Sequence, residues 1–432
     1  MSHPTEAGCL LESGALYASR VLLRRPEKAE EPIFAGSKRA AFSLYFGDAP
    51  IFHFDLEGRW QRAYVQGSHY LKGLDTTVQA IERVREGEGL VLKRRTLGGA
   101  EASDLDALVR AAALDLLDAL RAGRLERVEP PPSARPLATE ELRALLERIA
   151  RWDAAAWSAH GAEYRATYGP LPFLPPDSLG AIVLQATLGH AGGVAFGLGP
   201  VADHRVRSPR EFAEHARAVA ALLGRRAEQV RSLFLAGGDV LRQPADAVAA
   251  YLETAARVFP VASGPAPRLE GIDAPLDDPS APCLDRAAWG RFRGRHLRRV
   301  SLEVESGDPG VRALYRKAWR DDDLRTVVAD LKAAGLGVSV LVLVDAGGVE
   351  HAERHVAATA ELVNSLPLGA GDLVALLDGN EVRDPTRGAP GFTPLTGMPW
   401  ADQQSRLRTA LAPARAERGA KVAPYSLEKQ GA

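Results

Sequence analysis

Residues 182–199, IVLQATLGHAGGVAFGLG, decide the expected fold. Their first seven residues form an apolar run with few polar interruptions, which is typical of a strand buried on both faces of a parallel sheet. The glycine-dense stretch that follows, residues 189–199, indicates a loop at the carboxyl end of that strand. A helical pattern begins only at Pro209, where Ser208 and Glu211 have the spacing of a capping box. The segment is therefore predicted to be the first strand–loop–helix unit of a β/α fold.

Five more strand–helix units follow along the chain. This monotonous order lacks a dinucleotide-binding fingerprint and predicts a partial or complete (β/α)6 TIM-type barrel, with a doubly wound sheet as the alternative. Ligands bind at the carboxyl ends of the strands in both folds, so the residues just after each strand are the candidates for function. The five further strands are predicted at residues 230–236, 268–272, 299–304, 338–344 and 372–377.

The chain before residue 178 has a different character. Aromatic, alternating segments within residues 40–75 predict a small antiparallel β unit, and residues 76–85 and 101–121 have helical patterns. The proline-rich stretch 129–136 indicates a linker. We therefore predict an N-terminal α+β accessory region over 1–128, a helical linker over 129–177, the barrel over 178–385 and a C-terminal helical extension over 386–432.

Composition excludes several classes of protein. The formal net charge of −1 over 432 residues gives no electrostatic basis for binding nucleic acid or an anionic membrane. There is no run of about 20 apolar residues, and the N-terminus lacks the apolar core of a signal peptide, so we expect a cytoplasmic protein. Arginine outnumbers lysine 46 to 8, which is typical of a GC-rich bacterial genome.

The chain has only two cysteines, Cys9 and Cys283. This number fits a reducing compartment and excludes a disulfide scaffold. It also excludes any metal or cluster site that needs three thiolates from this chain, and we expect no metal site of another kind.

The predicted strand ends carry acidic residues and glycines. Gly237 and Gly238 precede Asp239, whose carboxylate suits an amine-bearing ligand, although a turn with a helix-capping aspartate is the alternative. Glu303 and Glu305 lie two residues apart in a strand and therefore point to the same side. Two inward carboxylates are costly unless they bind something, and they are candidate catalytic acid–base groups.

Four strand-end segments together resemble the radical S-adenosylmethionine (radical SAM) superfamily, in the branch that includes the Elongator-type catalytic domain. The similar segments are residues 182–189, residues 234–239, residues 299–307 and residues 333–348, and the resemblance covers about 178–385. It implies S-adenosylmethionine or a related nucleotide as cofactor. The residues that it implies for cofactor binding are Gly237, Gly238, Asp239, Glu305, Ser306, Gly347 and Gly348.

One departure from the family concerns its chemistry. The superfamily holds a 4Fe–4S cluster with three cysteines, spaced C-x-x-x-C-x-x-C, in the loop after the first strand. The aligned positions here are His190, Val194 and Gly197, which keep the spacing without the thiols. We therefore expect no 4Fe–4S cluster and no reductive cleavage of S-adenosylmethionine.

Three functional hypotheses remain. The first is a radical SAM-like pseudoenzyme that binds a small-molecule or peptide ligand, or that acts as the partner of an active paralogue. The second is an enzyme of the same fold that uses Glu303, Glu305, Asp239 and His190 in acid–base chemistry. The third is an iron–sulfur enzyme with unusual ligation through His190 and external thiols.

Two other patterns are assigned to structure. His351 and His355 lie one helical turn apart, and we predict a solvated helix face there in preference to a zinc site. Ser306 has no histidine near it in the sequence, so we do not expect a hydrolase.

Overall fold

The chain folds into two compact units. One comprises Met1–Thr167, Ala221–Gln229 and Gly431–Ala432, and the other comprises Tyr168–Ala220 and Val230–Gln430. Among the described residues, no helix is both long and apolar enough to cross a membrane. The computed structural model describes residues 19–26, 28–38, 40–86, 89–128, 135–189, 204–259, 269–280, 284–379 and 393–425.

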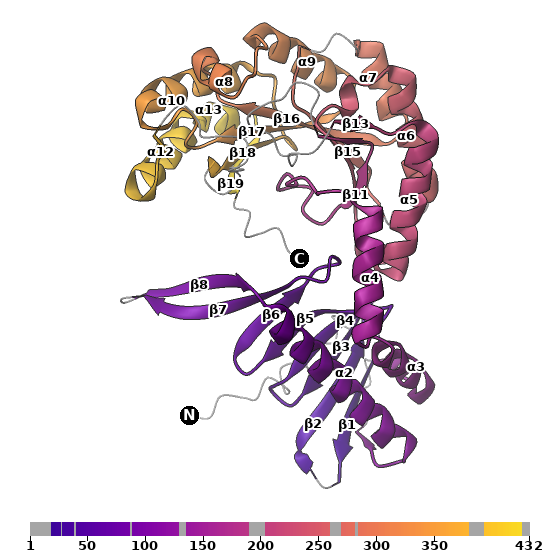
Figure 1. The fold of residues 1–432 in the computed structure, drawn as a ribbon. Helices are drawn as coiled ribbons and strands as arrows, with labels where there is room; N and C mark the ends of the chain where they lie inside the picture. Colours follow the sequence, from indigo (N-terminus) through magenta and orange to yellow (C-terminus); the bar gives the residue numbers. More distant parts are fainter. Residues whose placement is uncertain are drawn as a thin grey trace. The chain divides into compact units, whose positions relative to one another are not determined.

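The first unit contains a ten-stranded sheet (Figure 1). Its strands β1 to β8 follow one another as antiparallel neighbours, so short turns join most of them. At the β1 edge, β9 pairs antiparallel and β10 parallel with β1. The strands are β1 (Ser19–Arg25), β2 (Lys28–Ser37), β3 (Ala41–Phe46), β4 (Ile51–Asp55), β5 (Trp60–Val65), β6 (Ser68–Lys72), β7 (Val78–Glu86), β8 (Gly89–Thr96), β9 (Glu126–Val128) and β10 (Arg135–Pro136).

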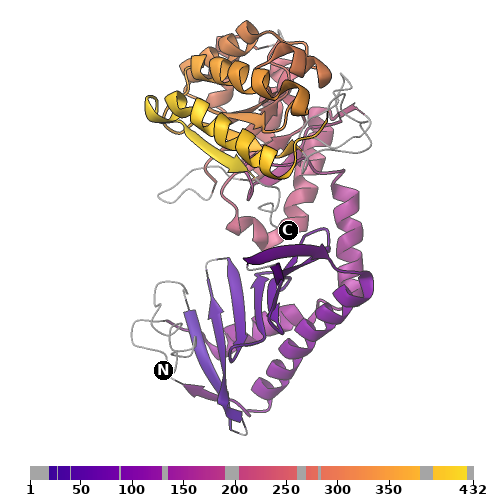
Figure 2. The ribbon, with the colours of Figure 1, turned by 90° about the vertical axis from the view of Figure 1, so that its left-hand side faces the viewer.

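Among the described residues of the first unit, the helices are α2 (Gly99–Arg121), α3 (Thr139–Ala150) and α4 (Ala154–Thr167). Helix α2 buries a stripe of apolar side chains at helical spacing, and this stripe packs into the core that the sheet aromatics form. Figure 2 shows α2 running along the curved sheet. The sheet contributes Phe42, Phe52, Phe54 and Trp60 to this core, and α2 contributes Leu105, Val109, Ala113, Leu116 and Leu117.

The first sheet is larger than the sequence predicts. Residues 76–85, predicted as a helix, contain most of strand β7, which pairs antiparallel with β6 and β8. Such a short segment is ambiguous in periodicity, and hydrogen bonding to two neighbouring strands decides its conformation. Strands β1 and β2 lie before residue 40, where the predicted antiparallel unit begins.

The second unit is built on a seven-stranded parallel sheet with the order β11-β14-β15-β16-β17-β18-β19. This order follows the chain without a reversal, as in a (β/α) barrel, whereas a doubly wound sheet reverses at a switch point. The predicted partial barrel is therefore the observed fold class, and the doubly wound alternative is wrong. The strands are β11 (Ile182–Gln185), β14 (Leu233–Ala236), β15 (Ile272–Leu276), β16 (Leu297–Glu305), β17 (Gly337–Leu343), β18 (Leu373–Leu377) and β19 (Lys421–Tyr425).

The helices between these strands lie along the outer side of the curved sheet (Figure 1). Helix α5 begins with the predicted capping box, in which the backbone N–H and the hydroxyl of Ser208 both donate to Glu211. The short strands β12 (Thr187–Leu188) and β13 (Arg205–Val206) form a separate pair. The helices are α5 (Pro209–Leu223), α6 (Ala245–Val258), α7 (Arg286–Arg293), α8 (Pro309–Leu314), α9 (Asp321–Ala333), α10 (Gly348–Ser365), α12 (Gly397–Ala410) and α13 (Ala412–Ala416).

The final strand was not recognised in the sequence. Residues 386–432, predicted as a helical extension, hold α12 and α13, but β19 also lies there and pairs parallel with β18. Pro424 lies within this strand. A proline lowers the expectation of a strand, and it is tolerated here because β19 lies at the sheet edge among the described strands.

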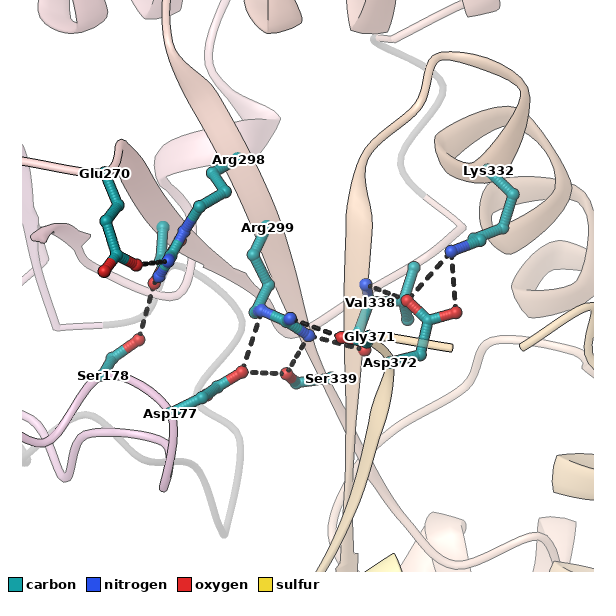
Figure 3. Close-up of polar contacts among 11 residues, drawn as sticks. Asp177, Ser178, Glu270, Arg298, Arg299, Lys332, Val338, Ser339, Gly371 and Asp372 are labelled. Atoms are coloured by element: carbon teal, nitrogen blue, oxygen red, sulfur yellow. Dashed lines mark hydrogen bonds and ion pairs between the residues drawn. The ribbon is translucent and has the colours of Figure 1, made fainter. Parts of the chain in front are cut away.

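A polar network ties together the amino ends of the barrel strands (Figure 3). The guanidinium of Arg299, at the start of β16, forms an ion pair with Asp177 at 2.9 Å and donates to the backbone oxygens of Val338 and Gly371. Ser339 of β17 donates to the same Asp177 carboxylate at 2.7 Å. Arg299 thus connects the segment before β11 with β17 and with the loop before β18.

Arg298 and Lys332 form similar contacts with carboxylates near the amino ends of other strands (Figure 3). Arg298 makes two hydrogen bonds to Asp273 and one to Glu270, and Ser178 donates to Asp273. Lys332 of α9 binds both oxygens of Asp372, the residue just before β18. These contacts lie at the end of the barrel opposite the strand ends where ligands bind in such folds, which indicates a structural role.

Replacing Arg299 tests this network. In Arg299→Met, Asp177 and two backbone carbonyls lose their charged donor, and we expect the free energy of unfolding to fall by about 2–4 kcal/mol. The control is Arg295→Met, because Arg295 forms an exposed pair with Glu253 whose loss costs about 1 kcal/mol or less. Urea denaturation of both variants gives the comparison, and equal losses would contradict the bridging role of Arg299.

Candidate functional site

Buried carboxylates gather at the carboxyl ends of the barrel strands. Asp239 follows β14, Asp277 follows β15, Glu303 and Glu305 end β16, and Asp345 follows β17. All five residues are at most 3% exposed. A carboxylate is rarely buried so completely without a partner, so the groups that contact these five residues define the chemistry of the site.

Lys317, which follows α8, is the cation at the centre of this cluster. Its ammonium lies 2.7 Å from Oε1 of Glu305 and 3.8 Å from Oε2 of Glu303, and it donates to the backbone oxygen of Glu303 at 2.9 Å. The three side chains are each 2% exposed. Glu303 and Glu305 therefore face the same cation, as their spacing predicted.

The backbone at Glu305 is unusual. Its φ of 56° lies in the left-handed region, which non-glycine residues rarely adopt. The pairing of β16 with β17 shifts register between Glu303 and Glu305. This β-bulge sets the direction of the Glu305 side chain. Strained backbone of this kind persists where surrounding contacts fix it, and it is concentrated at functional sites.

The charge balance of the cluster favours a neutral Glu305. Burial raises the pKa of Glu305 to about 8, and Glu303 and Asp277 add to the rise, while Lys317 offsets part of it. Burial opposes the charge of Lys317, but the attraction of the three carboxylates outweighs burial and raises the pKa of the ammonium. At neutral pH the cluster therefore holds a charged lysine beside Glu303 and a protonated Glu305. Oε2 of Glu305 is buried without a hydrogen-bond partner among the described residues.

The acidic cluster continues to the end of β14. Asp239 contacts Nε2 of His204 at 3.1 Å and the guanidinium of Arg242 at 3.5 Å. Arg242 also lies 3.6 Å from Asp278, so it connects the ends of β14 and β15. Asp239 precedes a short 3-10 helix, but its side chain makes no capping hydrogen bond, so it is an ion-pairing residue and not the cap considered as the alternative.

Gly237 has a packing role that its sequence position does not reveal. Its φ is 118°, and a Cβ atom there would lie 1.9 Å from the hydroxyl oxygen of Thr187 and 2.7 Å from its carbonyl oxygen. Glycine is therefore required for the end of β14 to lie this close to β12. Gly238 and Asp239 form the turn that follows.

Ser306 faces helix α10, and the acidic cluster lies elsewhere. Its hydroxyl lies 2.8 Å from Nδ1 of His355, which is also 3.2 Å from the hydroxyl of Thr359. Burial lowers the pKa of His355 to about 4, so this histidine is neutral at physiological pH. The predicted solvated helix face is wrong at His355, which is fully buried. The serine–histidine pair is equally closed to solvent, which gives no support to a hydrolase.

Two glycines allow close packing at helix α10, one after β16 and one at the start of the helix. A Cβ atom at Gly307 would lie 2.3 Å from the carbonyl oxygen of Ala358, and one at Gly347 would lie 2.7 Å from Cβ of His351. Gly347 and Gly348, both with positive φ, form the start of α10. The structure thus divides the residues implied for cofactor binding: Asp239 and Glu305 belong to the acidic cluster, whereas Ser306 and Gly347 support helix packing.

Several residues of the acidic cluster were not predicted from the sequence. Lys317, His204 and Arg242 complete the cluster, and none of them lies at the end of a predicted strand. One signal was available for Lys317, because lysine is rare in this arginine-rich chain. His190, Val194 and Gly197, the degenerate cluster positions, lie outside the described residues, as do Cys9 and Cys283.

A 4Fe–4S cluster does not fit this donor set. Three thiolates are needed from one loop, and the aligned positions provide one imidazole and two residues without ligating side chains. Among the described residues there is also no group of three histidine, cysteine or acidic side chains placed to hold a metal ion.

The pH dependence of stability tests the protonation of Glu305. Its folded pKa of about 8 lies above the ordinary value of 4.5, so its contribution to stability is fully present below pH 4.5 and is lost as the pH rises through 8. We expect Glu305→Gln, which mimics the protonated carboxyl, to lose less stability than the wild type between pH 6 and pH 9. The control is Glu361→Gln on the exposed face of α10, and thermal midpoints across the pH range provide the measurement. Parallel curves for wild type and Glu305→Gln would show that Glu305 is ionised when buried.

The close contact at Gly307 gives a second prediction. Gly307→Ala forces a methyl group into the backbone of α10, and we expect a loss of about 2–3 kcal/mol or more in unfolding free energy. Gly290→Ala in helix α7 meets no atom within 4 Å and should be neutral or stabilising by up to about 1 kcal/mol. Chemical denaturation compares the two variants. A tolerated Gly307→Ala would contradict the packing described for this motif.

Comparison with known proteins gives structural similarities only. No protein-family model matches the chain, and no curated protein matches it in sequence. Coproporphyrinogen III oxidase from Escherichia coli, a radical SAM enzyme, is 12% identical with a TM-score of 0.41, and the match covers 61% of this chain and 57% of that one. Elp3 from the archaeon Methanocaldococcus infernus is 13% identical with a TM-score of 0.35 over 56% of each chain. SuiB from Streptococcus suis, bound to S-adenosylmethionine, is 10% identical with a TM-score of 0.37, covering 83% of this chain and 70% of that one.

The chain therefore spans less than two thirds of the first two of these structures. At TM-scores below 0.5 these similarities carry no argument about function, and the barrel fold rests on the strand order of the chain itself.

Proposed function

We propose that the second unit is a radical SAM-like barrel that binds a cationic small molecule at the carboxyl ends of its strands, without iron–sulfur chemistry. The observation that carries this proposal is Glu305, a fully buried carboxyl group whose Oε2 has no hydrogen-bond partner among the described residues. Its backbone is held in a left-handed conformation, and Lys317 binds its other oxygen. The site thus contains an acceptor, Oε2 of Glu305, that forms no hydrogen bond with the described residues.

A cation is the ligand group that suits this acceptor. A positive charge beside Glu305 favours the ionised carboxylate, so binding displaces the proton that burial holds there. The sulfonium and ammonium groups of S-adenosylmethionine have this charge, and the family resemblance makes that cofactor or a related nucleotide the first ligand to test. The carboxylate of the same cofactor is the group that the acidic surroundings disfavour.

The absence of iron–sulfur chemistry in this proposal rests on the donor set. The three positions that resemble the cluster motif lack thiols, and the whole chain has two cysteines. Reductive cleavage of S-adenosylmethionine has no electron source in such a protein. The barrel therefore acts through binding, as a pseudoenzyme.

Calorimetric titration with S-adenosylmethionine and S-adenosylhomocysteine tests the proposal. Both ligands have the same amino and carboxylate groups, so their difference isolates the sulfonium charge. We expect S-adenosylmethionine to bind more tightly, and its advantage to grow about tenfold between pH 6.5 and pH 8.5 as Glu305 ionises. Glu305→Gln should remove this pH dependence, and Glu361→Gln should retain it. Equal affinities for the two ligands at both pH values, or no binding of either, would overturn the proposal.

One observation also favours an acid–base enzyme as a second candidate. A neutral carboxyl group with a pKa of about 8 can donate a proton to a bound substrate and be recharged near neutral pH. Lys317 would then stabilise the carboxylate that forms. An enzyme of this kind shows a rate that falls above pH 8 in the wild type, and Glu305→Gln abolishes its turnover.

A further inference from the structure

A second candidate site lies in the first unit, far in the sequence from the barrel residues. A cavity of about 630 Å³ opens between helix α2 and the segment that leads into α4. This volume is within the range of about 300–1,000 Å³ that holds small molecules in proteins. Its lining combines tryptophan rings with charged side chains, including Lys72, Asp106, Arg110, Trp152 and Trp157.

Asp106 provides a fixed negative charge in this cavity. Its carboxylate accepts hydrogen bonds from the ammonium of Lys72 at 2.8 and 2.9 Å and from the indole of Trp60 at 2.6 Å. Lys72 is 2% exposed and lies over the ring of Trp157 at 4.1 Å, whereas Asp106 retains 17% exposure. Lys72 is thus the buried member of the ion pair, and the carboxylate of Asp106 is the member that a ligand can reach.

Arg110 provides a fixed positive charge one helical turn away. Its Nε donates to the backbone oxygen of Ala150 at 2.8 Å, which holds the guanidinium in place. The two terminal nitrogens have no partner among the described residues, and they are the pair that binds carboxylates in two-point contacts. The contacts that hold Asp106 and Arg110 keep them from pairing with each other, although residues four apart lie about 5–6 Å apart on one helix face.

Two tryptophan rings and several small side chains form the apolar part of the lining, which also contains Thr76, Ser103, Asp153 and Ser158. Trp152 and Trp157 lie with ring centroids 4.6 Å apart, and the facing surface of α2 contributes small side chains. The indole N–H of Trp152 donates to the backbone oxygen of Glu57, which fixes that ring. A flat or branched apolar group can therefore pack against immobile aromatic surface.

We propose that this cavity binds a small zwitterion, namely an α-amino acid with an aromatic or branched apolar side chain. The ligand carboxylate binds Arg110, its ammonium binds Asp106, and its side chain packs on Trp152 and Trp157. The ligand has no net charge, which matches a lining where Lys72 and Arg110 are balanced by Asp106 and Asp153. This site is independent of the proposed function of the barrel, since every residue that forms it belongs to the first unit.

The test is calorimetric titration of the full chain with phenylalanine and two analogues. Phenethylamine lacks the carboxylate and 3-phenylpropanoate lacks the ammonium. We expect phenylalanine to bind at least tenfold more tightly than either analogue. Binding of an analogue as tight as that of phenylalanine, or no binding of any of the three, would overturn the proposal.

Variants of Arg110 localise the binding. Arg110→Met should weaken phenylalanine binding at least tenfold and remove the preference for phenylalanine over phenethylamine, whereas Arg110→Lys should restore part of both. Arg124→Met, a change at an exposed arginine near the end of α2, is the matched control and should bind as the wild type does. Unchanged affinity in a folded Arg110→Met protein would place the ligand elsewhere and overturn the assignment. If Arg110→Met does not fold, the analogue series on the wild type and the Arg110→Lys variant decide the question.

Discussion

The barrel depends on a single buried ammonium group. Lys317 faces Glu303 and Glu305 at the end of β16, in surroundings where each of the three side chains is almost completely excluded from water. Removing one charge from such a group leaves the others unmatched, which is far more costly than leaving an exposed pair broken. Lys317 therefore balances part of the negative charge of the carboxylates at the strand ends. Protonation of Glu305 removes a further negative charge.

The two ends of the barrel differ in how their buried charges are balanced. At the amino ends, Arg298 and Arg299 are each matched by a carboxylate and by further acceptors, so positive and negative charges are paired and the network serves cohesion (Figure 3). At the carboxyl ends, carboxylates are concentrated around Lys317 and one acceptor of Glu305 has no partner among the described residues. A protein retains such a mismatch only where surrounding structure supports it, and this asymmetry places the candidate function at the carboxyl ends.

Sequence reasoning was most successful where local pattern and tertiary structure agree. The apolar strands of the barrel and the helices between them were predicted because a buried parallel strand is almost continuously apolar and an amphipathic helix has a regular stripe. Strand β7 was missed because a short segment is ambiguous in periodicity and its pairing with β6 and β8 decides its conformation, and β19 was missed because it pairs with β18, almost fifty residues earlier in the chain. The site was predicted in part for the same reason: Glu305 lies at a strand end, whereas Lys317 reaches it from the segment after α8, and no spacing rule connects the two.

The motif residues that resemble a cofactor-binding family have two different physical explanations in this fold. Ser306 and Gly307 support the packing of α10 on the end of β16, through a buried hydrogen bond to His355 and a contact that leaves no room for a Cβ atom, and Gly347 allows the start of α10 to lie close to Val311 of α8. These requirements hold whether or not a cofactor binds, so such residues alone do not indicate a cofactor. Asp239 and Glu305 have no such packing function, and their burial as charged or protonated groups carries a cost that packing does not recover. A residue of the motif therefore indicates ligand binding only where its charge, and not its small size, is the required property. In this chain those residues are Asp239 and Glu305.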